Sequence, residues 1–98
     1  MAVVALLEVQ VDAESLQTSY DIVRETLKDT RAFDGCLSAD VLVDRDDPAH
    51  LVMMEKWESF EHDAAYRAWR AGPGAAVKLA AVLVGKPKLS VFAEHPEI

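Results

Sequence analysis

Five side chains in the second half of the sequence have types and spacings that suit chemistry on a flat organic ligand. Glu55 and Trp57 are two residues apart in a predicted strand and therefore point to one face. A buried carboxylate can act as a general base with a raised pKa, and a tyrosine hydroxyl can bind a phenol or quinone oxygen or a developing anion. We therefore predict that Glu55 and Tyr66 are catalytic. The predicted substrate-binding residues are Trp57, Trp69 and Arg70, because indole rings stack on aromatic ligands and a guanidinium steadies an anionic oxygen.

Each of these residues also has a structural interpretation, which the sequence leaves open. Glu55 could pair with an arginine across the dimer or lie at a wet edge. Trp57 could anchor a helix on the sheet, and the Tyr66 hydroxyl could point into water. Trp69 fits a position in the core or at its rim, and Arg70 fits a solvated surface.

The remaining reactive residues do not form a recognisable metal or cofactor motif. His50, His62 and His95 lack metal-ligand spacing, although His50 or His62 would serve as a base at the mouth of a pocket. Cys36 is the single cysteine, so an internal disulfide is impossible, and we expect a small buried apolar residue there. The sequence has no zinc pattern, phosphate loop or glycine-rich dinucleotide motif. We expect neither a metal nor a cofactor.

Composition restricts the classes of partner. A chain of 98 residues is long enough for one domain, residues 1–98, and too short for two. A net charge of −7 with scattered basic residues argues against binding to nucleic acids or anionic membranes. The apolar N-terminus lacks a basic start and is too short to span a bilayer. We therefore expect a cytoplasmic protein.

Hydrophobic periodicity predicts six main elements and one extra helical turn that position these side chains. Asp12 and Ser59 are good helix N-caps, and Gly72-Pro73-Gly74 ends a helix. The expected elements, in chain order, are a strand over 3–11, a helix from 12 to about 32, strands over 37–43 and 51–57 joined by a turn at 45–48, a helix over 60–69, a short buried helix over 75–84 and a strand over 88–94.

This order is the split β-α-β-β-α-β pattern of a ferredoxin-like α+β sandwich with an antiparallel sheet. The helices of such a fold cover one face of the sheet. The first strand is apolar on both faces in its first half, and 51% of all residues are apolar, so the other face would be an exposed sticky surface. Two copies packed face to face would bury it. We therefore expect a homodimer.

Three short motifs resemble the antibiotic biosynthesis monooxygenase family. They are Phe33-Asp34-Gly35-Cys36-Leu37 at the entry to the second strand, Val43-Asp44-Arg45-Asp46-Asp47-Pro48 at the hairpin, and Met54-Glu55-Lys56-Trp57-Glu58-Ser59 closing the third strand. The family fold is a dimeric α+β barrel. The resemblance implies a cofactor-independent monooxygenase that oxidises a small or polycyclic phenol towards a quinone, with a small aromatic molecule and dioxygen as substrates.

The chain also departs from this family. It contains no asparagine, and residues 75–84 contain no histidine, whereas the haem-cleaving relatives need both an asparagine and a histidine ligand. The resemblance therefore does not imply haem cleavage. Polyketide-oxidising relatives also use an asparagine near the pocket. Two alternatives remain open: a non-catalytic small-molecule-binding protein with the same cavity, and an isomerase or lyase in which Glu55 or a histidine moves a proton.

Overall fold

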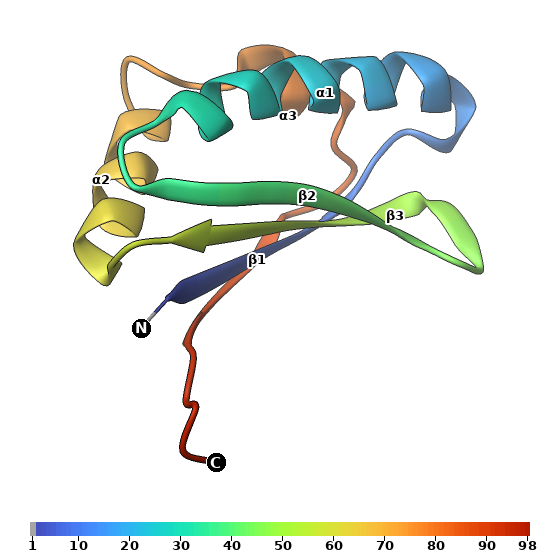
Figure 1. Ribbon diagram of the computed structural model, residues 1–98. Helices are drawn as coiled ribbons and strands as arrows, with labels where there is room; N and C mark the ends of the chain where they lie inside the picture. The colour runs from blue at the N-terminus through green and yellow to red at the C-terminus, as the bar shows by residue number, and fades with distance from the viewer. Residues whose placement is uncertain (1) are drawn as a thin grey trace.

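The computed structural model describes residues 2–98 as a four-stranded antiparallel sheet with helices on one side (Figure 1). Alternating and β-branched residues form the strands, and charged residues interrupted by an apolar stripe form the helices. The elements are β1 (Val3–Gln10), the 3₁₀ turn η1 (Ala13–Ser15), α1 (Leu16–Ala32), β2 (Cys36–Asp44), β3 (Asp47–Trp57), α2 (Phe60–Arg70), α3 (Val77–Val82) and β4 (Lys88–Ala93).

The strand order confirms the ferredoxin-like prediction. The sheet runs β2-β3-β1-β4, so β1 lies in the middle and pairs with both β3 and β4. Along these ladders Val3 faces Trp57 and Ala5 faces Glu55. The β1 backbone therefore sets the depth at which the candidate carboxylate is held beneath the helices.

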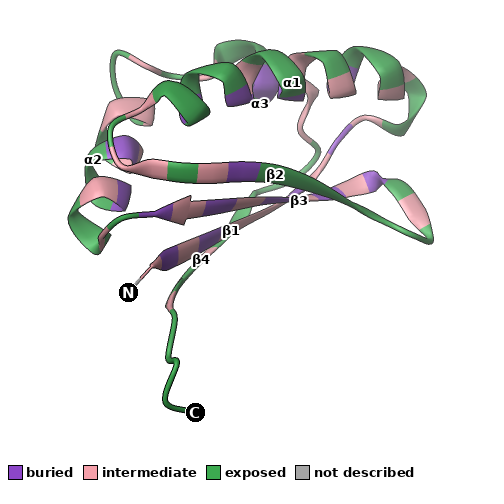
Figure 2. Cartoon of the chain, viewed as in Figure 1, coloured by how far each residue is buried: buried purple, intermediate pink, exposed green. Residues whose placement is uncertain are grey.

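The core lies between the sheet and the helices and has two parts. One extends from α1 over β1 and β3 and includes Val9, Leu27 and Leu51. The second lies under α2 and includes Trp57 and Tyr66. Figure 2 shows the buried residues along the strands and on α1 and α2. None of the helices in the described range 2–98 is long and apolar enough to cross a membrane.

Within residues 2–98, the opposite face of the sheet carries no helix (Figures 1 and 2). At one end of this outer face the His50 ring lies between two carboxylates, with Nδ1 at 2.8 Å from Asp44 and Nε2 at 2.7 Å from Glu8. Hydrogen bonds from Asp44 and then Glu8 raise the pKa of the His50 imidazole. The contact links β1, β2 and β3, and it is strongest while the imidazole is protonated.

Two details differ from the expected elements. The hairpin turn contains only residues 45–46, because the Asp44 side chain accepts a hydrogen bond from the Asp46 amide at 2.9 Å and turns the chain early. The last helix was expected to be buried, which is wrong. Leu79 is its single buried residue, whereas Val77 is 73% exposed, since only one side of α3 faces the rest of the chain.

Gly35 lies at the tight connection between α1 and β2 and has φ of +86°. A Cβ atom there would lie 2.2 Å from Cδ2 of His62. Gly85 has a similar φ of +74°. Apart from its neighbours in the chain, no atom of the described residues lies within 4 Å of the place where a Cβ atom of residue 85 would be. A substitution at either glycine would therefore strain the left-handed backbone, but only a substitution at Gly35 would also clash with His62.

We predict that Gly35→Ala lowers the free energy of unfolding by clearly more than Gly85→Ala does. The left-handed conformation alone costs alanine about 1–2 kcal/mol, and only Gly35 adds the overlap with His62. Urea unfolding of both variants measures the difference. Equal losses would mean that the His62 ring moves aside freely.

Candidate functional site

A cavity of about 200 Å³ lies between the sheet and all three helices, and we call it the inner cavity. Its floor comes from β1 and β3, and its sides come from α1, α2 and α3 with the segments that flank α3. The described residues that line it with apolar atoms are Leu7, Leu27, Met53, Ala76, Leu79, Ala80, Leu83 and Pro87. The polar lining residues are Thr26, Thr30, Glu55, Tyr66, Arg67 and Arg70. This is an apolar space with a few convergent polar groups, which is typical of a small-molecule site.

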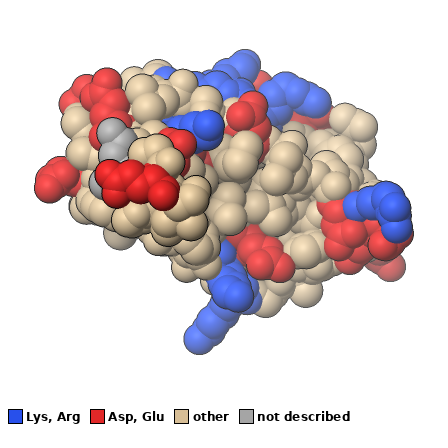
Figure 3. Space-filling model, turned by 60° about the horizontal axis from the view of Figure 1, so that its bottom comes forward, with Lys and Arg blue, Asp and Glu red and all other residues tan. Residues whose placement is uncertain are grey.

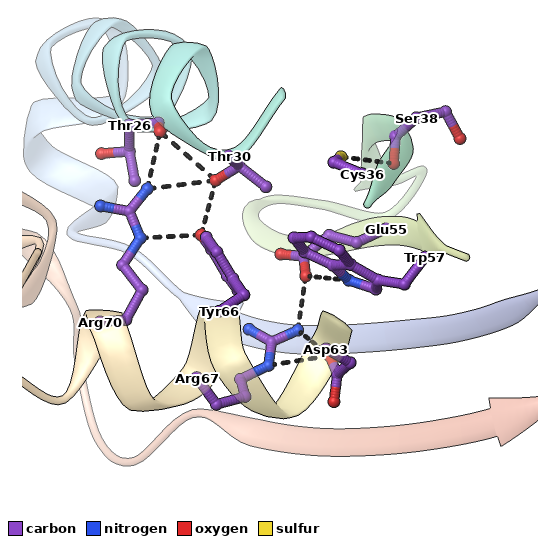
Figure 4. Close-up of polar contacts among 10 residues, drawn as sticks. All are labelled: Thr26, Thr30, Cys36, Ser38, Glu55, Trp57, Asp63, Tyr66, Arg67 and Arg70. Atoms are coloured by element: carbon purple, nitrogen blue, oxygen red, sulfur yellow. Dashed lines mark hydrogen bonds and ion pairs between the residues drawn. The ribbon is translucent and has the colours of Figure 1, made fainter. Parts of the chain in front are cut away.

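Glu55 is the most deeply buried of the ionisable residues that line the inner cavity, at 2% exposure. The Arg67 guanidinium donates to it at 2.5 Å, and the Trp57 indole N–H donates to the same oxygen at 3.3 Å (Figure 4). Arg67 also pairs with Asp63 at 3.1 Å, one helical turn earlier on α2. Two carboxylates therefore share one guanidinium, and only one of them faces the inner cavity.

Burial raises the pKa of the Glu55 carboxyl above its ordinary value, and the charge and hydrogen bond of Arg67 oppose that rise. A nearby Asp63 charge adds to the increase. The result is a carboxylate that accepts a proton more readily than a solvated glutamate. Such a shifted group in a cavity suits a general base.

A second hydrogen-bond network surrounds the hydroxyl of Tyr66. The oxygen lies 2.6 Å from Oγ1 of Thr30, and it accepts a hydrogen bond from Nε of Arg70 at 2.8 Å (Figure 4). The second guanidinium nitrogen of Arg70 donates to the Thr26 carbonyl at 2.9 Å and to Thr30 at 3.1 Å. The network joins α1 to α2 across the top of the inner cavity and fixes the position of the Tyr66 hydroxyl.

The structure therefore brings three of the five predicted residues to the lining of one cavity, namely Glu55, Tyr66 and Arg70. Trp57 is fully buried against Tyr66 and Phe33, with ring centroids 4.8 Å and 6.1 Å away, and it is not among the residues that line the inner cavity. It reaches the site through its indole N–H on Glu55. This geometry matches the interpretation of Trp57 as a packing anchor.

Trp69 lines a different space. It faces an open hollow of about 510 Å³ between α1 and the segment that joins α2 to α3, which we call the outer hollow. Thr26, Arg70 and Ala76 line both the outer hollow and the inner cavity. The two spaces therefore meet at Arg70, whose guanidinium lies 4.8 Å from the Trp69 ring.

Sequence reasoning missed Arg67 and two of the threonines of α1, Thr26 and Thr30. Arg67 follows Asp63 by four residues, which is a helical ion-pair spacing. Thr30 continues the apolar stripe of Val23 and Leu27 and is fully buried, so a polar residue on a buried face was the available signal. The long-range partners of these side chains could not be found from spacing along one element.

Cys36 and the histidines lie outside the inner cavity. Burial raises the pKa of the Cys36 thiol, and its sulfur donates to the Ser38 carbonyl at 3.6 Å (Figure 4), so the group suits packing and not nucleophilic attack. Within residues 2–98, no group of three or more His, Cys, Asp or Glu side chains is arranged to hold a metal ion.

Comparison with known proteins identifies the family of this chain. The model of the family described as antibiotic biosynthesis monooxygenase matches residues 2–77. The chain belongs to this family. The family match and the ferredoxin-like topology confirm the resemblance carried by the three sequence motifs. A search of curated proteins found no match.

Several solved structures share the fold. A conserved protein from Methanosarcina mazei Go1 superposes with a TM-score of 0.83 at 17% identity, covering 97% of this chain and 94% of that one. An antibiotic biosynthesis monooxygenase has a TM-score of 0.78 at 23% identity, covering 96% and 99%. SnoaB, a cofactor-independent oxygenase from Streptomyces nogalater, has a TM-score of 0.82 at 14% identity, covering 99% and 96%. At these identities the likeness concerns the fold.

We predict that Thr30→Val lowers the free energy of unfolding by about 1–3 kcal/mol, because it removes a buried partner of both Tyr66 and Arg70. Thr26→Val is the matched control. Its hydroxyl bonds only within α1, to the Ile22 carbonyl, and Arg70 contacts its main-chain oxygen, which the substitution keeps. Denaturant unfolding of both variants gives the comparison. Losses of the same size would contradict a special role for the Thr30 hydroxyl.

Proposed function

We propose that the protein is a cofactor-independent monooxygenase that oxidises a phenolic compound towards a quinone. The observation that carries this proposal is the buried Glu55 carboxylate on the wall of an apolar cavity that also holds Tyr66 and Arg70. Membership of the monooxygenase family and the fold shared with SnoaB, a cofactor-independent oxygenase, support the same activity.

The first step of the proposed reaction is proton transfer. The phenol O–H of the bound substrate gives its proton to the Glu55 carboxylate. Burial raises the pKa of this carboxyl, which favours its acceptance of a proton. The resulting phenolate carries negative charge in an apolar space, where fixed donors and cations act strongly. The guanidinium of Arg67, which contacts Glu55, lines that space and stabilises the anion.

The substrate itself supplies the electrons for the second step. The electron-rich phenolate reduces dioxygen. One oxygen atom replaces the hydrogen of an unsubstituted ring carbon, next to the hydroxyl when the opposite position is occupied, and becomes the new carbonyl. The other oxygen atom leaves as water with the ring hydrogen and the phenol proton. Phenol plus dioxygen thus balances as quinone plus water, and no external reductant is required. The contributions of the protein are binding, deprotonation and exclusion of solvent.

We predict that Glu55→Gln lowers kcat about 10²–10⁴-fold in oxygen-electrode assays with one-ring phenols and naphthols. The parent protein should lose kcat/KM as the pH falls through the raised pKa of Glu55, because only the ionised carboxylate accepts a proton. The variant should show no such limb. Anaerobic reactions give the background.

The matched control is Asp63→Asn. Asp63 pairs with the same guanidinium of Arg67 but does not line the inner cavity. Turnover should survive this change if the role of Glu55 is that of a base and not only of an ion-pair partner. Binding of the phenols without any oxygen consumption by the parent protein would remove the oxygenase proposal.

We also propose that the protein works as a homodimer joined through the outer face of the sheet. Support comes from the side chains that this face presents, which include half-buried Leu6 and Met54 and the exposed Leu42 and Phe92, at 47% and 52%. Figure 3 brings the underside of the molecule forward and shows a broad uncharged area between charged clusters. A second copy of the same face is the occupant that fits it, since apolar strips match and charges of both signs flank them.

We predict that Leu6→Lys weakens self-association at least about tenfold, because it places a charge in the middle of this apolar face. Val77→Lys on α3 is the control, since Val77 is apolar and 73% exposed but lies on the helix side. Sedimentation of the two variants and the parent at micromolar concentration measures the effect. A monomeric parent would contradict the proposed dimer.

A further inference from the structure

We infer that the inner cavity selects a one-ring phenol with a carboxylate at the ring position opposite the hydroxyl. Arg70 binds this carboxylate. The inference rests on the proposed function for its catalytic meaning and extends it to the class of substrate. It depends on three observations: the contacts of Arg70, the arrangement of charges along the cavity, and the size of the cavity.

Arg70 and Arg67 differ in how their charges are balanced. Arg67 contacts two carboxylates, those of Glu55 and Asp63. Arg70 has no carboxylate within ion-pair distance among residues 2–98. Its partners are neutral oxygens, from the Tyr66 hydroxyl, the Thr30 hydroxyl and two main-chain carbonyls. A half-buried guanidinium with only neutral acceptors keeps most of its positive charge available to a ligand.

The remaining donor of Arg70 is on the side of the outer hollow. A guanidinium has five N–H groups, and the contacts to Tyr66, Thr26, Thr30 and Gly74 use all but one of them. The unused N–H belongs to the nitrogen that contacts the carbonyl of Gly74, a residue of the outer hollow. The rings of Tyr66 and Trp69 lie 5.2 Å and 4.8 Å from the guanidinium carbon and hold it in place.

The acidic and basic groups that line the cavity lie at different depths. Glu55 is fully buried on the floor, on β3, whereas Arg70 lies where the inner cavity meets the outer hollow. Figure 4 shows the Tyr66 side chain between them. A ligand with a hydroxyl at one end and an anionic group at the other would reach both, with its ring among the apolar lining residues. Its charged end would stay partly solvated, which avoids most of the desolvation cost.

The outer hollow strengthens the attraction for an anion at this point. Lys28, Lys78 and Arg70 line it, against Glu25 and Asp29. The whole chain has a net charge of −7 and would repel an anion elsewhere on its surface. Positive charge at the mouth therefore directs an anionic ligand to the cavity.

The volume limits the ring system. A cavity of about 150 Å³ in another protein holds one benzene molecule. The inner cavity measures about 200 Å³, which is room for one substituted ring and not for three or four fused rings. A phenol with a single ring and an opposite carboxylate satisfies both the volume and the charges.

The test is the binding of 4-hydroxybenzoate and 4-hydroxybenzamide, which have the same ring and hydroxyl and differ in charge. Isothermal titration calorimetry under nitrogen measures binding without turnover. We expect the carboxylate to bind at least about tenfold more tightly than the amide, since a charged hydrogen bond outweighs a neutral one by roughly that factor. We also expect 2-hydroxybenzoate to bind about tenfold less tightly than 4-hydroxybenzoate, because its two groups lie side by side on the ring, whereas Glu55 and Arg70 lie on opposite sides of Tyr66.

Arg70→Gln should remove the preference for the carboxylate, and Arg24→Gln should keep it, because Arg24 lies on the exposed side of α1 and pairs with Asp21. Circular dichroism checks that the variants fold. If Arg70→Gln does not fold, amide chemical shifts of the parent decide. 4-Hydroxybenzoate should then perturb Gly74 and Ala76 at the mouth of the cavity more than the benzamide does.

Equal affinity for the acid and the amide, a preference that survives in Arg70→Gln, or no binding of either ligand would overturn the inference. The outcome is separable from that of the oxygenase proposal. Selective binding of 4-hydroxybenzoate without turnover of any phenol would leave charge recognition intact and remove the oxygenase. Turnover of neutral phenols without any preference for the acid would support the oxygenase proposal and overturn the inference of charge recognition.

Discussion

The site depends on one buried ion pair, between the Arg67 guanidinium and the Glu55 carboxylate. Glu55 is almost fully removed from solvent, and a carboxylate in that position without a partner would lose its charge or destabilise the fold by several kcal/mol. Arg67 prevents this, but its charge is shared with Asp63, so the stabilisation of Glu55 is incomplete. Burial raises the pKa of the Glu55 carboxyl, and Arg67 opposes that rise only in part, which supports the proposed role of Glu55 as a base.

The hydrogen-bond network around the Tyr66 hydroxyl differs from this ion pair because it contains no carboxylate. Arg70, Tyr66 and Thr30 join α2 to α1 through hydrogen bonds to neutral oxygens, and this cross-link keeps the roof of the cavity in place above β3. It also leaves a cation at the mouth. The two arginines, three residues apart on α2, therefore have different surroundings: Arg67 contacts the proposed base, and Arg70 lies at the mouth where we propose that the ligand enters.

The same sheet separates the two proposed surfaces of the protein. Its inner face carries the cavity and Glu55, and its outer face carries the apolar strip proposed for dimer contact. Because side chains alternate along a strand, neighbouring residues of β3 serve the two faces in turn, as Glu55 and Met54 do. A shift of register by one residue would exchange the two functions, so the long ladder between β1 and β3 protects both.

The sequence by itself determined the order of the elements, the family motifs and the residue types of the base and its neighbours, because strand alternation and helical spacing are local properties. It placed Glu55, Tyr66 and Arg70 as candidates, since each stands out on its own element. Only the tertiary structure decided that Trp57 packs away from the cavity, that the last helix exposes most of its side chains, and that Thr30 and Arg67 complete the networks. These outcomes depend on contacts between segments far apart in the chain, and burial and pKa shifts arise only when such segments pack together.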